Sequence, residues 1–483
     1  MMSVRRQASL WISLVALSGC AVGPNYRAPA TPASAAGPFV STAPSSAASE
    51  AVPPDWWRLY NDPVLDRLVR EALVENDDLK VAAANLTNAQ ALVSQARAGL
   101  FPSTDASAGA AYGRSATSDE LASLTGAKAA ATWFYSTGFS AAYQVDLFGQ
   151  IRRSIEAARA SAEAQQAAED AVRVTVAAET AAAYANVCGY AEQAATARRS
   201  LQLVQESYDI TVRQRDAGAL SDFDVARAAT LLEQTRAAIP TFDGQRRAAL
   251  FELTALLGKT PAEAPADAAA CQTPPRLAQP LPVGDGAALL KRRPDVRQAD
   301  RQLASATAKI GVAVASLYPS VSLGGAINAG ADTPGQLFNY NSVSYSAGPL
   351  ISWTFPNTLV ALAQIRQARA VASGALASFD STVVQALKET EQALTTYAAE
   401  LDRHGALSAA RDRANEALRL AQIQYQAGTA SYLDLLTAET TVVNAEQALA
   451  ASDQLLSSDQ VAVFQALGGG WEDAPAVVAP KVG

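Results

Sequence analysis

The chain has 483 residues, of which 17% are charged and 49% hydrophobic, and its formal net charge is −8. This acidic balance provides no basic surface for a nucleic acid. Much of the hydrophobic fraction is alanine, the strongest helix former, so the composition favours many closely packed helices over one thick core of large side chains.

The N-terminus predicts an export signal. Arg5 and Arg6 precede a short apolar run and a group of small residues, so residues 1–19 are interpreted as a signal peptide. The ending Leu-Ser-Gly-Cys resembles a bacterial lipobox, which implies cleavage before Cys20 and a covalent lipid on that cysteine. An ordinary secretory signal with an incidental cysteine is the alternative. Ala21, in place of an aspartate, agrees with sorting to the outer membrane.

Residues 20–55 are rich in Pro, Ala and Ser and predict an extended tether between the lipid and the folded body. Ordered structure is expected to begin at the Trp-Trp pair 56–57. Asp62 followed by Pro63 predicts a helix N-cap with proline at the first helical position. This helix is expected to end near residue 99.

Two segments with strand-like patterning follow at 104–148 and 320–355. In the first, Tyr143 and Val145 alternate with Gln144, which is the period of a β-strand. Each segment is predicted to form a β-hairpin. Aromatic residues near the strand ends suit a membrane interface, namely Trp133, Tyr135, Trp353 and Phe355. Soluble hairpins are the alternative.

Each hairpin precedes a very long segment without proline, 151–217 in the first case and about 358–427 in the second. Residues 151–257 and 358–467 each predict a long helix, a tight turn and a shorter returning helix, with glycine in the turn at Gly218 and Gly428. A seven-residue repeat of apolar residues in the second returning helix predicts packing along its length as a coiled coil. Its members are Leu435, Val442, Leu449, Leu456 and Val463.

The same order of predicted elements occurs twice. The tetrapeptide Leu-Phe-Pro-Ser at 100–103 recurs as Leu-Tyr-Pro-Ser at 317–320. Self-similarity of this kind indicates a repeat architecture, and the predicted repeats cover 56–258 and 288–468.

The remaining segments are a connector and a tail. Residues 259–287 form a Pro-rich connector, and 469–483 are expected to be a disordered tail. Cys188 lies in a long predicted helix and Cys271 in the connector. An oxidising exported compartment permits a disulfide between them, but two free thiols are equally compatible with the spacing.

Four strands cannot close a membrane barrel, since the smallest use about eight. Open strand edges cannot face lipid either, because each unpaired backbone group there costs several kcal/mol. If the hairpins lie in a membrane, several chains must therefore share one barrel. Two, three or four chains satisfy this condition.

The chain resembles the TolC-like outer membrane factor family, in particular its NodT-type lipoprotein branch. The likeness covers nearly everything from Cys20 to Trp471. Besides the two turns, it rests on the segments Cys-Ala-Val-Gly-Pro-Asn-Tyr at 20–26, Trp-Trp at 56–57 with Asp-Pro at 62–63, Asp-Leu-Phe-Gly at 146–149, and Arg-Arg-Pro-Asp-Val at 292–296.

The resemblance implies a mainly helical homotrimer with membrane β-hairpins. Four strands from each chain would form a twelve-stranded barrel in the outer membrane, standing on a long helical tunnel in the periplasm with an equatorial belt. It also implies two partners, a periplasmic adaptor protein and an inner-membrane transporter of the resistance-nodulation-division type. The chain itself would be a passive, gated exit duct for drugs and other small molecules.

The resemblance places function at the two turns, which would form the periplasmic mouth. Asp434 matches an aspartate at the family's constriction, and Tyr425 matches a tyrosine that holds the tunnel shut. The residues expected to dock the adaptor are Gly218, Leu220, Ser221, Asp224, Gly428 and Ser431. Asp434 could instead serve as a carboxylate in the first turn of a helix, where the macrodipole favours it. A second aspartate found in some relatives is Thr437 here, which weakens the argument for a cation-binding ring.

Three alternatives remain. A type I protein-secretion duct would share this architecture. A lipid-anchored periplasmic coiled-coil scaffold would not require aromatic hairpins. An enzyme is disfavoured, because the chain has one histidine, His404, within a helical pattern, and no metal cluster, phosphate loop or nucleophile motif.

Overall fold

The computed structural model describes residues 21–480 except 31, 42–46, 49, 51, 115–119, 121–123, 125, 127–129, 278 and 357. The predicted signal peptide and Cys20 lie outside the described residues. The chain divides into two compact units. The first contains residues Met1–Ala28, Asn88–Ala164 and Ala299–Ser378, and the second contains Pro29–Thr87, Gln165–Gln298 and Phe379–Gly483.

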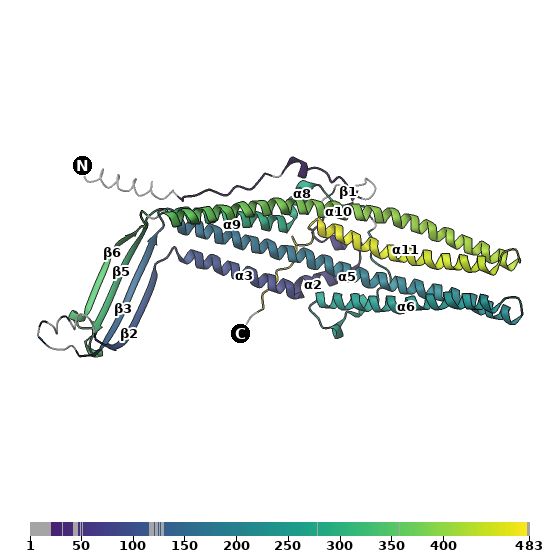
Figure 1. Ribbon diagram of the computed structural model, residues 1–483, viewed down its shortest axis with the longest axis horizontal. Coiled ribbons are helices and arrows are strands. Elements are labelled where there is room, and N and C mark those ends of the chain that lie inside the picture. Colours follow the sequence, from purple (N-terminus) through teal and green to yellow (C-terminus); the bar gives the residue numbers. More distant parts are fainter. Residues whose placement is uncertain are drawn as a thin grey trace. The chain divides into compact units, whose positions relative to one another are not determined.

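The first unit contains an antiparallel sheet of four strands in the order β2-β3-β5-β6 (Figure 1). The strands are β2 (Ser103–Gly113), β3 (Thr132–Val145), β5 (Ser320–Ala331) and β6 (Val343–Ser352). Both predicted hairpins are therefore present. They also pair with each other through β3 and β5, with Phe139 opposite Ile327. Among the described residues, β2 and β6 each have one edge without a partner strand.

Helices form most of the chain, and their order follows the prediction. α3 (Asp77–Ala98) precedes β2 and β3, and α5 (Gln150–Asp216) and α6 (Asp222–Leu256) follow them. α9 (Pro294–Ala315) precedes β5 and β6, and α10 (Leu359–Gln426) and α11 (Tyr432–Ala466) follow them. Within the described part of the chain, no helix is both long and apolar enough to cross a bilayer. Short elements complete the chain: η2 (Ala33–Ala35), β1 (Ala47–Ala48), η5 (Pro334–Gln336) and η6 (Tyr340–Ser342).

The main hydrophobic core lies in the second unit. η3 (Trp56–Tyr60) places Trp56, which is fully buried, against Phe464 of α11, with stacked rings whose centroids are 4.6 Å apart. The sequence predicts that ordered structure starts at this Trp-Trp pair, but the same core also contains Phe39 and Val52, which precede it. Four of the five seven-residue-repeat positions in α11 are buried, and Leu449 is half-buried.

The helix predicted to run from Pro63 to about residue 99 is two helices. α2 (Pro63–Glu75) is capped by Asp62, whose Oδ1 accepts hydrogen bonds from the Val64 and Leu65 N–H groups at 2.8 and 3.1 Å. Asn76 then adopts an extended backbone and caps α3, while its Nδ2 donates to the Leu256 carbonyl at 3.0 Å. The helix is interrupted at Asn76 because the buried Asn76 side chain forms its hydrogen bond with Leu256, which is distant in sequence.

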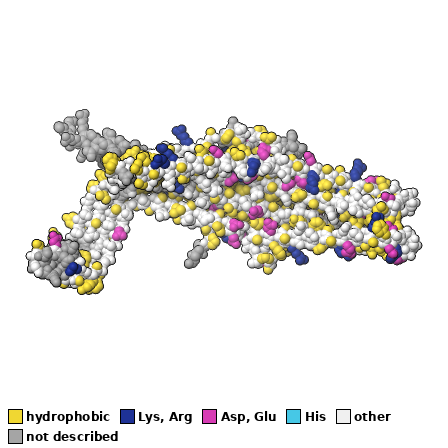
Figure 2. All heavy atoms as spheres, in the orientation of Figure 1, with side chains coloured by type: hydrophobic (Ala, Val, Ile, Leu, Met, Phe, Trp, Pro, Cys, Tyr) yellow, Lys and Arg dark blue, Asp and Glu magenta, His cyan; other side chains and the backbone are white. Residues whose placement is uncertain are grey.

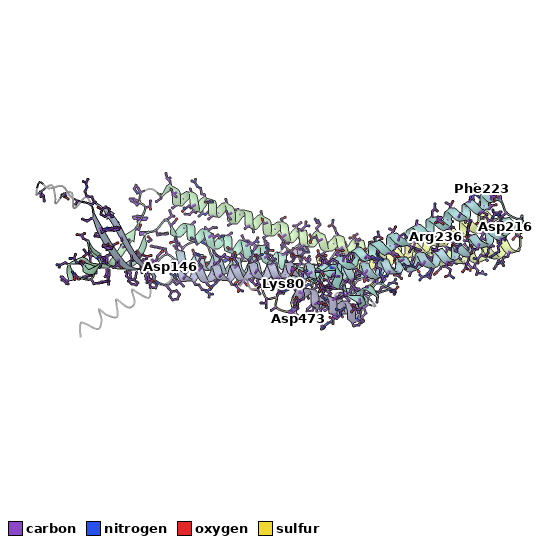
Figure 3. All side chains as sticks on the ribbon, turned by 90° about the horizontal axis from the view of Figure 1, so that it is seen from below. Lys80, Asp146, Asp216, Phe223, Arg236 and Asp473 are labelled. Carbon is purple, nitrogen blue, oxygen red and sulfur yellow. A yellow bond between two sulfur atoms is a disulfide. The ribbon has the colours of Figure 1, made fainter. Side chains whose placement is uncertain are left out.

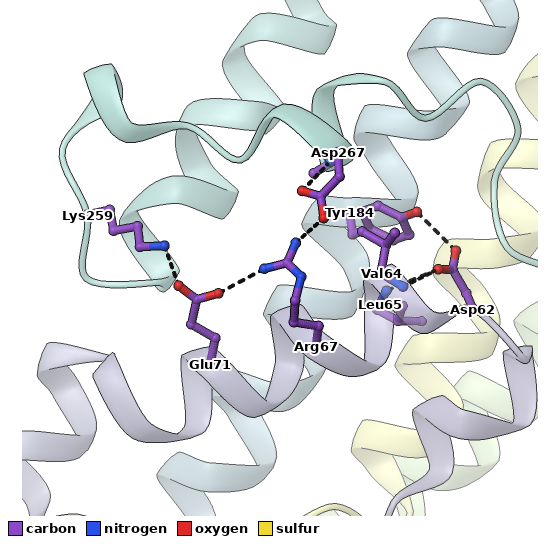
Figure 4. A network of polar contacts seen from close by, with 9 residues as sticks. Asp62, Val64, Leu65, Arg67, Glu71, Tyr184, Lys259 and Asp267 are labelled. Carbon is purple, nitrogen blue, oxygen red and sulfur yellow. Dashed lines mark hydrogen bonds and ion pairs between the residues drawn. The ribbon is translucent and has the colours of Figure 1, made fainter.

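The connector packs against α2. It contains η4 (Pro261–Glu263), α7 (Ala266–Ala269) and β4 (Leu281–Pro282), and leads to α8 (Gly286–Arg292). Figure 4 shows Arg67 of α2 bridging Glu71 and Asp267, with Lys259 also bonded to Glu71. The sequence left the pairing of the cysteines open, and the structure joins Cys188 of α5 to Cys271 of the connector in a disulfide.

Two terminal expectations need correction. Residues 469–483 do not begin as a disordered tail, because Gly470 packs on Trp56 and Trp57, and the Trp471 Nε1–H donates to the Arg292 carbonyl at 3.2 Å. The linker at 20–55 is not a free tether either. Phe39 and Val52 are buried, and the backbone N–H groups of Val40 and Ser41 donate to the Glu391 carboxylate at 2.7 and 2.9 Å.

Replacing Cys271 with serine should destabilise the second unit, because the disulfide links residues 83 positions apart and restricts the unfolded chain. The loop-closure entropy of a loop of this size predicts a loss of up to about 4.5 kcal/mol. Thermal unfolding in detergent, followed by circular dichroism, measures the loss. Wild-type protein treated with reductant is the control and should unfold at the same temperature as Cys271→Ser; equal stability of the oxidised and reduced proteins would contradict this.

Candidate functional site

The four-stranded sheet has two chemically different faces. Side chains alternate between the faces of a strand, so the observed register fixes which residues share a face. One face is mainly apolar and includes Ala106, Ala108, Ala110, Tyr112, Trp133, Tyr135, Phe139, Tyr143, Val145, Val321, Leu323, Ile327, Val343, Tyr345, Pro349 and Ile351. The other is mainly small and polar and includes Ser103, Asp105, Ser107, Ser136, Ser140, Gln144, Ser320, Ser322, Asn328, Ser344, Ser346 and Ser352.

Few residues depart from this division. Phe134 and Leu350 are large apolar residues on the polar face, and Phe134 covers Gly330, where a Cβ atom would lie 2.8 Å from the ring. Within the four described strands, Asp105 is the only charged residue. Figure 2 shows few charged side chains on the visible surface of the sheet.

Aromatic residues gather near both ends of the strands. At one end, the ring of Trp133 lies 5.5 Å from that of Tyr112 and 6.1 Å from that of Tyr135. At the other, Trp353 stacks on Phe355 at 4.7 Å, just after β6. An apolar band between aromatic belts, on strands whose opposite face is polar, is the pattern of a transmembrane β-barrel.

The second unit carries the two helix-hairpin tips, which we define as residues 214–225 and 424–435. Gly218 and Gly428 lie at the turns with φ of +75° and +71°, which favour glycine. A Cβ atom built at either glycine would meet no atom within 4 Å. The requirement for glycine is therefore one of backbone conformation and not of space.

Both tips begin their returning helix with the same capping box. The Ser431 hydroxyl donates to Asp434 Oδ2 at 2.7 Å, and the Asp434 N–H donates to Ser431 Oγ at 3.2 Å. Ser221 and Asp224 repeat this arrangement at 2.7 and 3.3 Å. Hydrogen bonds from the serines lower the pKa of both carboxyl groups. Within one chain, Asp434 therefore acts as an ionised first-turn carboxylate, which is the simpler of the two sequence interpretations.

Tyr425 connects the two tips. Its hydroxyl donates to Gln214 Oε1 on α5, and its ring meets Tyr432 edge-on, with centroids 6.2 Å apart. Burial raises the pKa of Tyr425, so the hydroxyl retains its proton at neutral pH. The first tip has Arg215 in the equivalent position, and this residue pairs with Asp216 and Asp222 of its own tip at 2.8 and 3.0 Å.

A cavity of about 440 Å³ lies between the two hairpins beside Tyr425. Leu203, Gln214, Tyr432 and Glu439 are among its lining residues. Glu439 is 2% exposed, and burial raises the pKa of its carboxyl group. The contacts beside this cavity join α5 to α10 and α11, so their loss would free the hairpins to separate.

The sequence analysis missed two exposed apolar residues at the tips. Phe223 and Leu433 follow the capping serines by two positions, and they are 63% and 49% exposed. Figure 3 shows Phe223 at the tip near Asp216, and the Arg227 guanidinium lies 4.2 Å from the centre of its ring. The sequence signal for these two residues is their shared position, two residues after the capping serine of each returning helix. Leu220, which the sequence analysis selected, is half-buried.

His404 Nε2 lies 2.6 Å from Asp453 Oδ1 in a helix-to-helix contact that Arg276 shares. The described part of the chain contains no group of three or more His, Cys, Asp or Glu residues arranged to hold a metal ion.

Replacing Gly428 with alanine should destabilise its tip by about 1–2 kcal/mol, because a Cβ atom is strained at positive φ. The matched control is Gly405→Ala. Gly405 lies in helical backbone on α10 with open space around it, so the same substitution should stabilise that helix by about 1 kcal/mol. Hydrogen exchange of amides 424–435 should accelerate in the first variant only. Equal exchange in the two variants would show that the turn does not need glycine.

Comparison with known proteins agrees with this geometry. The model of the family described as "Outer membrane efflux protein" matches residues 68–259 and 287–469. Nodulation protein T of Rhizobium leguminosarum bv. viciae is 31% identical over 478 residues, which cover 96% of this chain and 93% of that protein. The antibiotic efflux pump outer membrane protein ArpC of Pseudomonas putida is 31% identical over 484 residues, covering 96% of this chain and 95% of that protein.

A solved structure shows the same fold. The outer-membrane channel OprN matches with a TM-score of 0.85 and 35% sequence identity, covering 94% of this chain and 100% of that chain. The family model and the full-length relatives extend over both units described here. The chain belongs to the outer membrane efflux protein family.

Proposed function

We propose that this chain is the outer-membrane exit duct of a tripartite efflux pump, a passive and gated channel for drugs and other small molecules. The observation that carries the proposal is the two-faced sheet. Its apolar face suits lipid, its polar face suits a water-filled lumen, and its aromatic residues lie near both ends of the strands. A relative that matches 96% of the chain is named as an efflux pump outer membrane protein.

The open edges of β2 and β6 support a closed oligomer, and the number three is the one that the family resemblance implies. A sheet of four strands is too small to close on itself, and edge groups left unpaired in lipid cost several kcal/mol each. If β2 of one chain pairs with β6 of the next, three chains form a closed barrel of twelve strands. Trimer formation would also assemble the helical hairpins of two tandem repeats per chain into a periplasmic tunnel with an equatorial belt.

The two tips form the periplasmic mouth in this proposal. Tyr425 holds the second hairpin against the first through Gln214. Three copies of ionised Asp434 gathered at the constriction would repel one another, raise each other's pKa and attract cations. The adaptor would dock on the turns, using Gly218, Leu220, Ser221, Asp224, Gly428 and Ser431. Exposed Phe223 and Leu433 add an apolar contact at each turn.

The remaining assignments follow from the same family. A lipid on Cys20 would anchor the chain in the outer membrane, and a resistance-nodulation-division transporter would supply the energy. A type I protein-secretion duct is the second candidate, but the full-length relatives reported above are named for efflux and nodulation. A periplasmic coiled-coil scaffold is disfavoured, because it would leave the apolar face of the sheet exposed to water.

Channel recordings test both the duct and its gate. Purified protein in planar bilayers should form pores, and Asp434→Ala should loosen the closed state and raise the single-channel conductance, because cations attracted to the constriction could no longer bridge the three carboxylates. Asp224→Ala is the matched control, since it removes the same capping hydrogen bonds from the other tip. Wild-type protein without pores would contradict the duct, and equal conductance of the two variants would remove Asp434 from the gate.

A further inference from the structure

The cavity beside Tyr425 contains an acid that the proposed duct does not use. Glu439 lines this cavity and is 2% exposed. Its Oε2 atom has no hydrogen-bond partner among the described residues. Burying a carboxyl oxygen without a partner destabilises a fold. Packing alone therefore does not explain an acid at this position.

Glu439 also interrupts an apolar helix face. Between residues 432 and 443 of α11, the other buried residues are Tyr432, Leu435, Val442 and Val443. Leu435 and Val442 belong to the seven-residue repeat that packs this helix along its length. An apolar side chain at position 439 would continue that face without the cost of removing a carboxyl group from water.

The first hairpin forms the same structure without the acid. Ser221 and Ser431 cap the two returning helices in the same way. Eight residues after the capping serine, the first helix has Ala229 where the second has Glu439. The turn and helices of a tip therefore do not require an acid here, so the acid is a property of the cavity and not of the hairpin.

Aromatic and aliphatic side chains form much of the cavity wall. The rings of Tyr425 and Tyr432 line it, together with Leu203, Ile210 and Leu435. The faces of aromatic rings attract cations, and aliphatic side chains suit an apolar body. The wall therefore favours a molecule that combines a positive charge with an apolar part.

The charged groups at the cavity are all acidic. Glu206 of α5 is the second acidic residue of the described lining, which includes no Lys, Arg or His. A bound group would therefore meet negative charge without competition from a positive side chain. The volume of about 440 Å³ lies in the range of about 300–1,000 Å³ that is typical of small-molecule sites. These features select a small organic cation.

Such a cation would also offset the cost of burying Glu439. Burial raises the pKa of the Glu439 carboxyl group, and a hydrogen bond with Ser207 opposes part of this shift. A positive charge nearby favours the ionised form of an acid. A bound cation would therefore lower the pKa of Glu439 and pair with its carboxylate.

Both hairpins contribute to the cavity. Leu203 and Gln214 come from α5 of the first hairpin, whereas Tyr425 comes from α10 and Glu439 from α11 of the second. The site is complete only while the hairpins lie together, as the hydrogen bond from Tyr425 to Gln214 holds them. A ligand that binds only one of two arrangements shifts the equilibrium towards it.

We propose that this cavity is a binding site for a small organic cation, an ammonium group on an apolar body, with Glu439 as the residue that pairs with the charge. The bound cation holds the two hairpins together and so favours the closed duct. The site depends on contacts within one chain, whereas its effect on the gate rests on the proposed function.

Binding of 2-phenylethylammonium to the full-length protein in lipid nanodiscs tests the site by isothermal titration calorimetry. Glu439→Gln keeps the size of the side chain and should weaken binding at least about tenfold, as expected for loss of a charge-assisted hydrogen bond. Glu416→Gln is the matched control, because Glu416 is exposed on α10 outside the cavity. The neutral analogue 2-phenylethanol should bind both proteins equally weakly. Asp434→Asn should retain the affinity, which separates this site from the proposed constriction.

The effect on the hairpins has its own measurements. The cation should slow hydrogen exchange of amides 424–435 and lower the open probability of wild-type pores in planar bilayers, and Glu439→Gln should abolish both effects. Absence of binding, or equal affinity of wild type and Glu439→Gln, would overturn the site. Binding that leaves hydrogen exchange unchanged would overturn its role in holding the hairpins. Binding by protein that forms no pores would support the site and overturn the duct.

Discussion

The structure depends on one constraint: backbone N–H and C=O groups cannot remain unpaired in lipid. Each chain contributes a sheet with an apolar face and two open edges, β2 and β6. Such a sheet would be unstable in a membrane as a monomer, and pairing of neighbouring chains along those edges would complete it. A separate cost, that of placing a charged side chain in lipid, would explain why the strands carry almost no charge while charged side chains are frequent on the helices. In the proposed duct, oligomer formation would therefore follow from the need to pair the open strand edges, and it would bring the helical hairpins of neighbouring chains together.

The two tips share one capping arrangement but differ in the contacts that they make with the rest of the chain. Ser221 with Asp224 and Ser431 with Asp434 form the same capping box, so geometry within one chain does not distinguish the two aspartates. The difference lies three residues before each turn glycine. Arg215 forms ion pairs within its own tip, whereas Tyr425 reaches the other hairpin and bonds to Gln214. This asymmetry makes the second tip the better candidate for a moving gate, since its contacts bridge two elements that can separate.

Local signals predicted much of the fold and several site residues. The Asp62 cap, both tip glycines and the buried row in α11 depend on neighbours within about two helical turns, and the sequence was sufficient for them. Features that depend on distant partners were missed. The helix breaks at Asn76 because its side chain donates a hydrogen bond to the Leu256 carbonyl. Residues 469–471 are ordered because Gly470 packs on Trp56 and Trp471 donates a hydrogen bond to the Arg292 carbonyl. The start of the linker is ordered because Arg153 donates a hydrogen bond to the Val22 carbonyl. The exposed Phe223 and Leu433 were missed because the sequence pattern alone did not show which apolar residues remain uncovered.

The measurement that most directly tests the central claim is a scan of spin labels along β3, from residue 137 to 144, in protein reconstituted into liposomes. Collisions with oxygen report lipid, and collisions with a water-soluble nickel complex report water. The account predicts strict alternation, with labels at Thr137, Phe139, Ala141 and Tyr143 exposed to oxygen, and labels at Gly138, Ser140, Ala142 and Gln144 exposed to nickel. Equal access of the nickel complex to both sets would contradict it, because the sheet would then lie in water and its open edges would need no partner chains.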